Sequence, residues 1–439
     1  MLAAMPRPAT SPSPPGDSSP RDRGDACPGT LRLHRADDGS LARVRVPGGL
    51  LTAARAKALG AAAESLGDGE LHLTSRGNVQ LRGLRPDCGG ELAGRLGEAG
   101  LLPSARHERI RNIVASPLSG LDGRGARDVG PWLRELDALL CASGRTAGLS
   151  GRFLFVLDDG RGDVDALGGD VTLLARDDAT ALLRIGTAAA TVRIPGARAP
   201  RAALVAAEAF LDRAAGTGAW RVPDLPGGAD ALREEVVRRL RETVPGGLAV
   251  EDHACPSGSG GPAPGVVTGP DGTAALCVGI PLGRVGPEQW RVLTDTARRR
   301  GRGELRLTPW RGVVVPGVRA SESAGLLDEL AATGLVVGPD SPWSGVGACI
   351  GRPGCARSLA DVRGQAAAVV GPVGPLPVYW SGCERRCGHP RGEWVDVVAT
   401  PDGHRITLVR GEVRDAPVSV PDGSGGLAAA VAAARRAHG

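Results

Sequence analysis

Four cysteines stand close together in the sequence, in loops where a hydrophobic core does not account for them. The segments "GACIGRPGCARS" and "SGCERRCGHP" place Cys349 and Cys355 in a C-x5-C pattern and Cys383 and Cys387 in a C-x3-C pattern. Gly, Pro and Arg are frequent among their neighbours. Four thiolates at short spacings can bind either zinc or an iron–sulfur cluster. Metal binding is therefore the first chemistry that the sequence predicts.

The spacing of these cysteines favours a 4Fe-4S cluster. Structural zinc sites usually pair C-x2-C knuckles around one small ion, whereas a cluster spreads its ligand sulfurs over four irons. Glycine allows loops to bring backbone N–H groups close to cluster sulfides. The glycines near the four cysteines are Gly345, Gly347, Gly351, Gly354, Gly382 and Gly388. We expect Cys349, Cys355, Cys383 and Cys387 to bind the cluster, with zinc or ordinary buried thiols as the alternatives.

The other five cysteines are scattered singly. They are Cys27, Cys88, Cys141, Cys255 and Cys277. An odd total of nine in a chain of this length argues against a disulfide framework. Each is expected to be a small buried apolar residue, and the sequence does not indicate a further role for Cys27.

An internal repeat provides the elements that must position such a site. The landmarks separated by a constant 234 residues are Pro47 and Pro281, Glu70 and Glu304, Thr74 and Thr308, and Gly83 and Gly317. In the first copy, apolar periodicity predicts a strand over 40–47, a helix over 52–66 capped by Thr52, a strand over 71–84 bent at 76–78, and a helix over 89–102. This order is typical of a ferredoxin-like half-domain.

The repeat predicts an internally duplicated α/β (α+β) protein. Each half-domain is followed by a larger lobe, and one site is expected at the interface of the two copies. The predicted division is a disordered tail over 1–26, half-domain 1 over 27–102, an α/β lobe over 103–225, a helix and flexible linker over 226–265, half-domain 2 over 266–336, and a second α/β lobe carrying the cysteines over 337–439.

Composition excludes several classes of protein. Apolar residues make up 42% and charged residues 23%, no apolar run is long enough for a bilayer span, and the first 26 residues lack the apolar centre of a secretory signal. We expect a cytoplasmic protein with no membrane segment. A net charge of +5 and a content of 3% aromatic residues do not favour nucleic acid as a binding partner. The basic residues are almost all arginine, which suits a site that binds several carboxylates, although codon bias also explains the excess.

The repeat, the segments "LTSRGNVQLRG" and "RNIVASPLSG", and the cysteine set resemble the nitrite and sulfite reductase family. Members of that family hold a 4Fe-4S cluster beside a sirohaem. The segment "SGCERRCGHP", the "ACPG" at 26–29 and the short chain are most similar to the oxygen-dependent branch, which acts in aerobic cobalamin biosynthesis. The resemblance covers nearly the whole chain after residue 26.

This resemblance implies a monooxygenase that converts precorrin-3A, a metal-free tetrapyrrole rich in carboxylates, to precorrin-3B by hydroxylation at a meso carbon with formation of a γ-lactone. It implies O2 and a reduced nicotinamide as co-substrates. No dinucleotide motif is present, so a separate reductase or ferredoxin is expected to donate the electrons. The positions that match the family's tetrapyrrole contacts are Arg45, Arg76, Asn78, Gln80, Arg111, Asn112 and Arg152. A mononuclear non-haem iron is also implied, but no histidine spacing locates its ligands, and the catalytic acid or base is not identified.

One departure from the family pattern concerns the chemistry. Sirohaem reductases typically carry a K-x-K pair, whereas this chain has Arg152, Phe153 and Leu154. Arginine stays charged and is a poor proton donor. This departure argues against the first alternative function, a sirohaem-dependent nitrite or sulfite reductase. The second alternative is a non-catalytic tetrapyrrole-binding or electron-carrying protein. The second copy has "PWRGVVVPG", with apolar residues at the positions of Asn78 and Gln80, so one site is expected.

Overall fold

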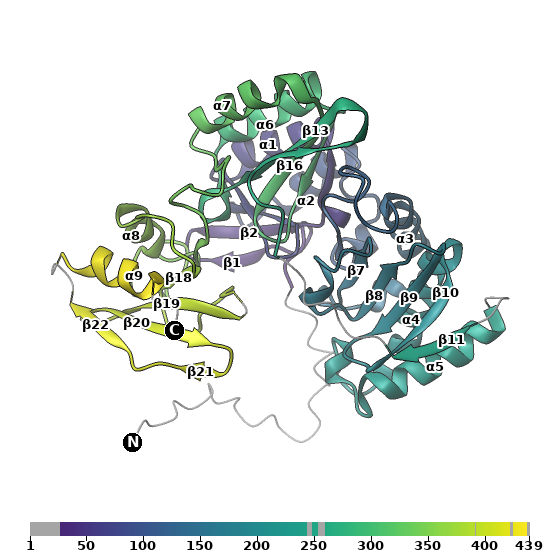
Figure 1. Ribbon diagram of the computed structural model, residues 1–439. Coiled ribbons are helices and arrows are strands. Elements are labelled where there is room, and N and C mark those ends of the chain that lie inside the picture. Colours follow the sequence, from purple (N-terminus) through teal and green to yellow (C-terminus); the bar gives the residue numbers. More distant parts are fainter. Residues whose placement is uncertain (1–26, 244–247, 253–259, 391, 422–424, 437–439) are drawn as a thin grey trace.

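The computed structural model describes residues 27–243, 248–252, 260–390, 392–421 and 425–436. The predicted tail over 1–26, Cys255 and part of the predicted linker lie outside these residues. Two half-domains lie side by side at the top of Figure 1, with one lobe on each side below them. The predicted α/β class with two ferredoxin-like half-domains is confirmed. None of the described helices combines the length and the apolar character that a bilayer span requires.

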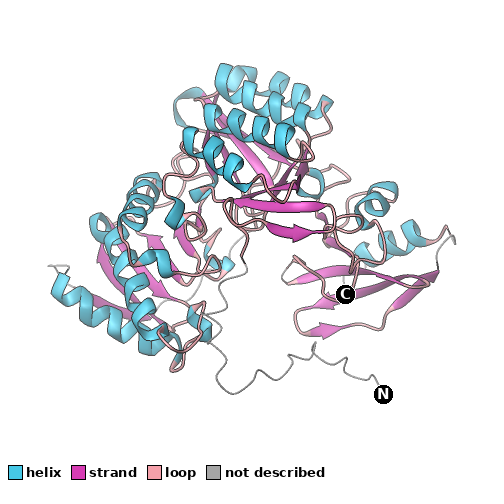
Figure 2. Ribbon diagram, turned by 180° about the vertical axis from the view of Figure 1, so that it is seen from behind, coloured by secondary structure: helices cyan, strands magenta, loops and turns pink. Residues whose placement is uncertain are grey.

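Half-domain 1 packs two helices on one face of a sheet. Its elements are β1 (His34–Ala36), β2 (Gly39–Val44), β4 (Leu71–Leu73), β5 (Val79–Leu84), α1 (Ala53–Leu66) and α2 (Gly89–Glu98). The predicted cap of α1 is confirmed, because the Thr52 side chain accepts a hydrogen bond from the backbone N–H of Arg55 at 3.2 Å. Alternating apolar residues of the strands, including Ala42, Val44 and Leu81, are fully buried beneath the helices, which lie at the top of Figure 2.

The strand predicted over 71–84 is instead a hairpin. Strands β4 and β5 pair antiparallel, with His72 opposite Gln80. The turn is closed by the N–H of Asn78, which donates to Thr74 Oγ1 at 3.1 Å, and Gly77 supplies a positive φ of 65°. Alternating residues continue on both sides of the turn, so periodicity alone did not separate one bent strand from two. The second copy has the same hairpin.

Half-domain 2 repeats this plan and exchanges strands with half-domain 1. Its elements are β12 (Gly265–Thr268), β13 (Thr273–Gly279), β14 (Arg284–Val285), β15 (Glu304–Leu307), β16 (Gly312–Arg319), α6 (Pro287–Arg299) and α7 (Ser323–Ala332). Strand β3 (Leu50–Thr52) of the first copy pairs with β15, and β14 of the second copy pairs with β4. Each copy therefore completes the other's sheet, and one hydrophobic core spans both half-domains.

The first lobe is a mixed sheet covered by helices. Its elements are β6 (Ile113–Ala115), β7 (Phe155–Asp158), β8 (Val171–Ala175), β9 (Thr180–Ile185), β10 (Ala190–Pro195), β11 (Ala249–Asp252), α3 (Gly130–Ala142), α4 (Ala199–Ala214) and α5 (Gly228–Thr243). Strands β6, β7 and β8 are parallel and the rest antiparallel. Helix α5 packs on α4, and β11 pairs with β10. The segment predicted as a helix and linker over 226–265 therefore contributes a helix and a strand to this lobe.

The second lobe repeats the order and directions of the first four strands of that sheet. Its elements are β17 (Val346–Ala348), β18 (Val378–Ser381), β19 (Glu393–Thr400), β20 (Gly403–Arg410), β21 (Val413–Arg414), β22 (Val418–Pro421), α8 (Val362–Ala368) and α9 (Leu427–Arg436). Strands β17, β18 and β19 are parallel, and β20 is antiparallel to β19 across the predicted turn at Asp402 and Gly403. The lobes therefore match each other, as the duplication predicts.

Candidate active site

The two cysteine loops leave the same edge of the second lobe's sheet. Cys349 follows β17 directly, and Cys383 lies two residues beyond the end of β18, its parallel neighbour. Carboxyl ends of neighbouring parallel strands lie at one edge of a sheet, so the two loops meet there. The N–H of Leu359, in the loop that carries Cys355, donates to the carbonyl of Gly382 at 2.8 Å.

The donor set and its backbone fit an iron–sulfur cluster. The N–H of Gly382 donates to Cys349 Sγ at 3.3 Å, and a Cβ at Gly382 would lie 1.7 Å from Ser358 Oγ. Among the described residues, no three cysteine sulfurs lie within 4.8 Å of one another. Tetrahedral zinc at its usual Zn–S distance would hold sulfurs about 3.8 Å apart. Burial, with Cys383 and Cys387 nearby, raises the pKa of the Cys349 thiol.

Half-domain 1 holds the loop that carries Cys355. Arg82 is 5% exposed and binds both carboxylate oxygens of Asp38, at 2.8 and 2.7 Å. The same guanidinium donates to the carbonyl of Gly354 at 3.0 Å, and Asp37 accepts from the N–H of Ala356 at 2.5 Å. The turn between β1 and β2 therefore fixes the residues on both sides of Cys355.

One face of the half-domain 1 sheet is polar. Arg43 on β2 and His72 on β4 are both register partners of Gln80 on β5, and Arg284 on β14 is the partner of His72. Directly paired residues point to the same face, so these four side chains form a row across the sheet. The opposite face is the apolar one beneath α1 and α2.

The predicted residues Arg45, Asn78 and Asn112 form a buried network where the first lobe meets this face. Arg45 is 3% exposed and donates to the carbonyl of Gly151 at 2.7 Å and to Asn112 Oδ1 at 3.2 Å. Asn78 Nδ2 also donates to Asn112 Oδ1, at 3.0 Å, and Asn112 Nδ2 donates to the carbonyl of Phe153. These polar groups are satisfied within the protein, so they hold the lobe against the half-domain.

Arg111 lies next to this network but points away from it. Its Nε and Nη2 donate to the two oxygens of Asp137 on α3, both at 2.7 Å, and its Nη1 donates to the carbonyl of Leu101. The guanidinium already has an internal carboxylate, so it is not available to one on a substrate. The structure separates Arg111 from the other predicted residues.

Three arginines near this network, Arg43, Arg76 and Arg152, retain donors that no acceptor among the described residues satisfies. Arg76 uses Nη1 to reach the carbonyl of Arg152 at 3.2 Å, and Arg152 is exposed, with its guanidinium 4.3 Å from the ring centroid of Trp220. Burial, followed by repulsion from Arg221 and Arg43, lowers the pKa of Arg76 to about 10. The buried Nε of Arg43 has no hydrogen-bond partner in the described part of the chain. The group therefore has an excess of positive charge.

Sequence reasoning missed Arg43 and the contact between Cys27 and the arginines. Cys27 Sγ accepts from Arg45 Nη2 at 3.1 Å and from Arg43 Nη1 at 3.5 Å. Arg43 lies on β2 and Arg45 follows the end of that strand directly, so alternation places both on one face. That pattern could have identified Arg43, whereas nothing local pairs Trp220 with Arg152.

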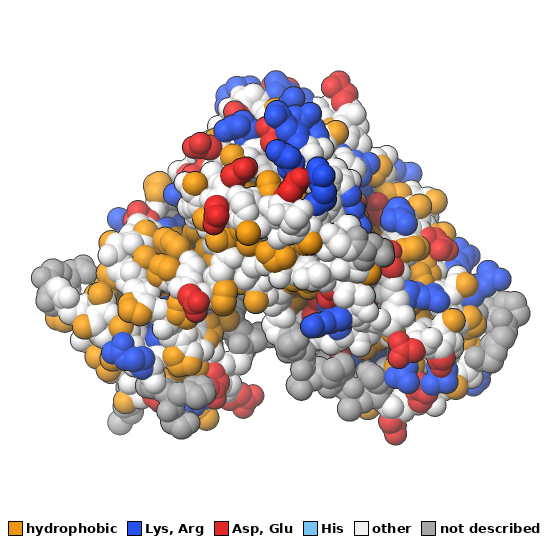
Figure 3. Space-filling model, turned by 45° about the horizontal axis from the view of Figure 1, so that its top comes forward, with side chains coloured by type: hydrophobic (Ala, Val, Ile, Leu, Met, Phe, Trp, Pro, Cys, Tyr) orange, Lys and Arg blue, Asp and Glu red, His pale blue; other side chains and the backbone are white. Residues whose placement is uncertain are grey.

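The corresponding face of half-domain 2 is mostly apolar, and its buried Arg306 donates to the carbonyls of Pro117 and Ser119 in the first lobe. Cys277 and Val314 occupy the positions 234 residues after Arg43 and Gln80, and they are register partners. Both pack in one hydrophobic cluster with Leu118 and Leu121 of the first lobe. The first lobe thus covers this face, whereas the polar face of half-domain 1 lies between the cysteine loops and the first lobe. Figure 3 shows a notch between the two lobes below the half-domains.

Comparison with known proteins agrees with this architecture. Residues 33–99 and 268–333 match the model of the nitrite/sulfite reductase ferredoxin-like half domain. The chain carries the half domain of the nitrite and sulfite reductases twice. The predicted resemblance to that family is confirmed, and both matches fall on the two half-domains.

Relatives match along most of the chain. A precorrin-3B synthase of Sinorhizobium sp is 27% identical, over 92% of this chain and 86% of the relative. A ferredoxin–nitrite reductase of Synechococcus elongatus is 26% identical, over 80% and 74%. The solved structure of the Mycobacterium tuberculosis NirA protein has a TM-score of 0.70 at 20% identity, over 89% of this chain and 79% of that one, which shows a shared fold.

Proposed function

We propose that the chain is an oxygen-dependent oxidoreductase of cobalamin biosynthesis that converts precorrin-3A to precorrin-3B. Two findings support this proposal. The similarity to a precorrin-3B synthase covers 92% of the chain, and the polar sheet face offers cationic partners for a substrate rich in carboxylates. O2, with electrons from a reduced nicotinamide through a separate reductase or ferredoxin, completes the proposed reaction.

The observation that carries the proposal is the unsatisfied positive charge of Arg43, Arg76 and Arg152. Guanidinium groups bind carboxylates through paired hydrogen bonds, most strongly where the charges are partly desolvated. We assign carboxylate binding to these three residues. Gln80 lies in the middle of the polar face, and its amide makes no hydrogen bond within the described residues, so it is assigned to a substrate polar group.

The predicted residues Arg45, Asn78 and Asn112 receive a different role in this proposal. They fix the first lobe relative to the polar face and thereby orient the substrate-binding arginines. Arg111 stabilises the lobe through Asp137 and contacts no substrate. Cys349, Cys355, Cys383 and Cys387 would hold a 4Fe-4S cluster, which supplies electrons one at a time.

The alternative function is a sirohaem-dependent nitrite or sulfite reductase. Similarity to the cyanobacterial nitrite reductase favours it. The residues at the K-x-K position do not: Phe153 and Leu154 are 0% and 2% exposed, and Arg152 stacks on Trp220. No side chain there can release a proton, which reduction of an oxyanion requires.

Purification without oxygen, followed by absorption and EPR spectra with iron and sulfide analysis, tests the proposal first. Iron and sulfide in equal amounts without chlorin-like bands are expected. The protein is then incubated with precorrin-3A, O2 and a reductant, and mass spectrometry should detect a product that has gained one oxygen atom.

Variants Cys383→Ser and Arg198→Gln serve as the negative and positive controls; Arg198 is exposed and lies in the first lobe. Bound sirohaem together with nitrite or sulfite consumption would establish the reductase instead. A protein that binds precorrin-3A but never converts it would support a non-catalytic binding protein.

A further inference from the structure

A hydrogen-bonded link connects half-domain 1 to the loop of Cys349. Arg363 on α8 donates from Nε to the carbonyl of Cys349 at 3.1 Å and from Nη1 to His72 Nδ1 at 3.2 Å. His72 is 6% exposed and lies between Gln80 and Arg284 in the polar row described above. This link is therefore the point where the substrate-binding face reaches the proposed cluster.

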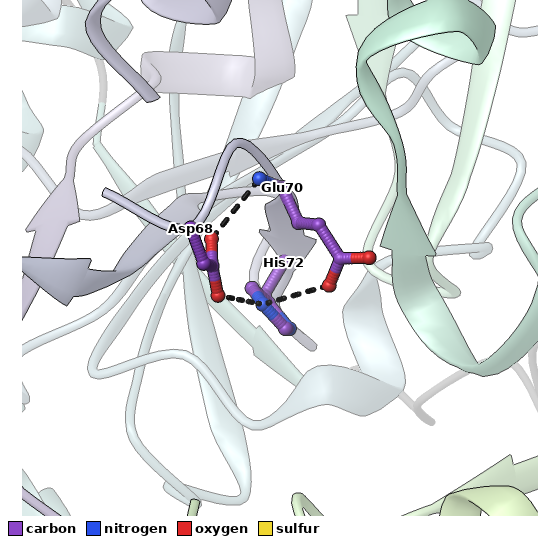
Figure 4. Close-up of side chains that lie close together, drawn as sticks. All are labelled: Asp68, Glu70 and His72. Atoms are coloured by element: carbon purple, nitrogen blue, oxygen red, sulfur yellow. Dashed lines mark hydrogen bonds and ion pairs between the residues drawn. The ribbon is translucent and has the colours of Figure 1, made fainter. Parts of the chain in front are cut away.

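The imidazole of His72 also faces two carboxylates, as Figure 4 shows. His72 Nε2 lies 3.7 Å from Asp68 Oδ2 and 3.9 Å from Glu70 Oε2, without a hydrogen-bond partner among the described residues. Such a trio resembles a cation site. A guanidinium can only donate, however, so His72 Nδ1 must accept and a neutral ring carries its hydrogen on Nε2. A protonated Nε2 cannot bind a metal, and it points this hydrogen towards the acidic pair.

The trio therefore orients the imidazole. Burial lowers the pKa of His72, so the ring is neutral near pH 7 and can accept from Arg363. Arg363 is half-buried, and its charge faces no carboxylate in the described ion pairs. Burial, together with Arg284 and Arg82 nearby, lowers the pKa of Arg363 to about 10, which leaves it cationic at neutral pH.

A positive charge in this position acts on a reducible group at Cys349. Reduction of a cluster bound by four thiolates adds negative charge, and a nearby cation in a medium of low dielectric favours the reduced form. The exposed Arg284, at 3.4 Å from Glu70, belongs to the same row but makes no hydrogen bond or ion pair with the cysteine loops among the described residues. The chain thus offers two neighbouring arginines in different settings.

We propose that Arg363 raises the reduction potential of the cluster at Cys349, Cys355, Cys383 and Cys387, and that His72 is the positioning residue that holds Arg363 against the Cys349 loop. The inference rests on the proposed function only in requiring that these cysteines hold a cluster. It assigns a role to the buried histidine that the substrate site does not use.

The experiment is an EPR-monitored redox titration of the anaerobically purified or reconstituted protein, with iron and sulfide measured for every variant. Arg363→Gln should lower the equilibrium constant for one-electron reduction at least tenfold, which is 59 mV. Arg363→Lys keeps the positive charge, so its reduction potential should fall by less than half as much as that of Arg363→Gln. Arg284→Gln is the matched control and should shift the potential much less than Arg363→Gln, because Arg284 is exposed and paired with Glu70.

His72 is tested in the same titration. His72→Leu should shift the potential in the direction of Arg363→Gln, and the double variant should match Arg363→Gln alone, because both changes act through one contact. His72→Asn, whose Oδ1 can accept from Arg363, should restore most of the wild-type potential.

The outcomes separate this inference from the proposed function. Wild-type protein that binds no iron and sulfide would overturn the cluster assignment, and the inference with it. A full cluster whose potential is unchanged in Arg363→Gln, or shifts that add in the double variant, would overturn only the inference. If Arg363→Gln loses its cluster, the potentials of Arg363→Lys and His72→Leu decide the question.

Discussion

At the scale of single residues, the arginines of the site divide by their partners. Arg45 and Arg111 are buried and donate to protein acceptors, whereas Arg76 and Arg152 keep free donors. The sequence predicted all four as substrate contacts, because residue type and motif position do not reveal which carbonyl or carboxylate a folded chain brings near. Substitution of an arginine with free donors should therefore weaken substrate binding, whereas substitution of a buried, paired arginine should lower the stability of the protein.

Arg76→Gln is expected to weaken binding of the tetrapyrrole about tenfold or more, since a charge-assisted hydrogen bond contributes roughly 1.5–3 kcal/mol. Stability should change little, because the substitution also removes repulsion from Arg43 and Arg221. Titration of the purified protein with the tetrapyrrole, followed by fluorescence, measures the affinity. Unchanged affinity would remove Arg76 from the site; Arg198→Gln is the control on an exposed arginine.

Arg111→Met is expected to lower the free energy of unfolding by roughly 1–3 kcal/mol, because Asp137 would lose its partner in a half-buried position. Affinity for the tetrapyrrole should stay at the wild-type value in protein that remains folded. Urea denaturation measures the stability, and the double variant with Asp137→Leu should recover much of the loss. A large loss of affinity at full stability would contradict this assignment.

At the scale of elements, the cysteine loops depend on close backbone contact. The edge of β17 and β18 places Cys349 and Cys383 together, and Gly382 lies where no side chain fits. The sequence predicted that these cysteines bind the cluster and that their loops need glycine, since both predictions follow from local spacing. It did not predict the pairing of β17 with β18, which are short and separated by a helix.

Gly382→Ala is expected to abolish cluster binding while leaving most of the fold intact, because the new Cβ would overlap Ser358 Oγ. Iron and sulfide content, together with the visible absorption of the cluster, provides the measurement. Gly94→Ala on α2, where a Cβ meets no atom within 4 Å, is the control and should keep the wild-type content. A full cluster in the Gly382→Ala variant would show that the loop adapts.

At the scale of the whole molecule, the duplication places corresponding sheet edges in the two lobes, and only one of them carries the cysteine loops. In the first lobe, Ser116 follows β6 as Cys349 follows β17. Beside it, Asp158, Asp159 and Asp163 form a buried acidic group, and Asp163 lines a cavity of about 670 Å³ against β12. The repeat could be found from the sequence. What lies at the sheet edge of the first lobe could not, because it depends on how that lobe packs against its neighbours, and periodicity does not encode this packing.

The acidic group makes Asp163 sensitive to pH. Burial, with Asp158 and Asp159 nearby, raises the pKa of Asp163 to about 6. A carboxyl group whose pKa is higher in the folded than in the unfolded protein lowers the free energy of unfolding. This loss is complete above about pH 6, and it disappears as the pH falls towards the pKa of the group in the unfolded chain. Asp163→Asn should therefore stabilise the protein by up to about 3 kcal/mol at pH 8 and by much less at pH 4.5.

Urea denaturation at both pH values tests this prediction, with the exposed Asp177→Asn as the control. Equal stability of Asp163→Asn and wild type at pH 8 would contradict the raised pKa. The hydrogen bond from Ser116, at 2.6 Å, can also be made to an amide oxygen, so the comparison isolates the charge.

The reciprocal exchange of β3 and β14 also sets the order in which the chain can fold as it is synthesised. Strand β4 ends at Leu73, but the strand that covers its edge, β14, ends only at Val285. At 5–20 residues per second, the ribosome needs on the order of 10–40 s to supply it. Throughout that interval the first half-domain has an open sheet edge, so a first lobe that folds during synthesis does so beside an incomplete neighbour.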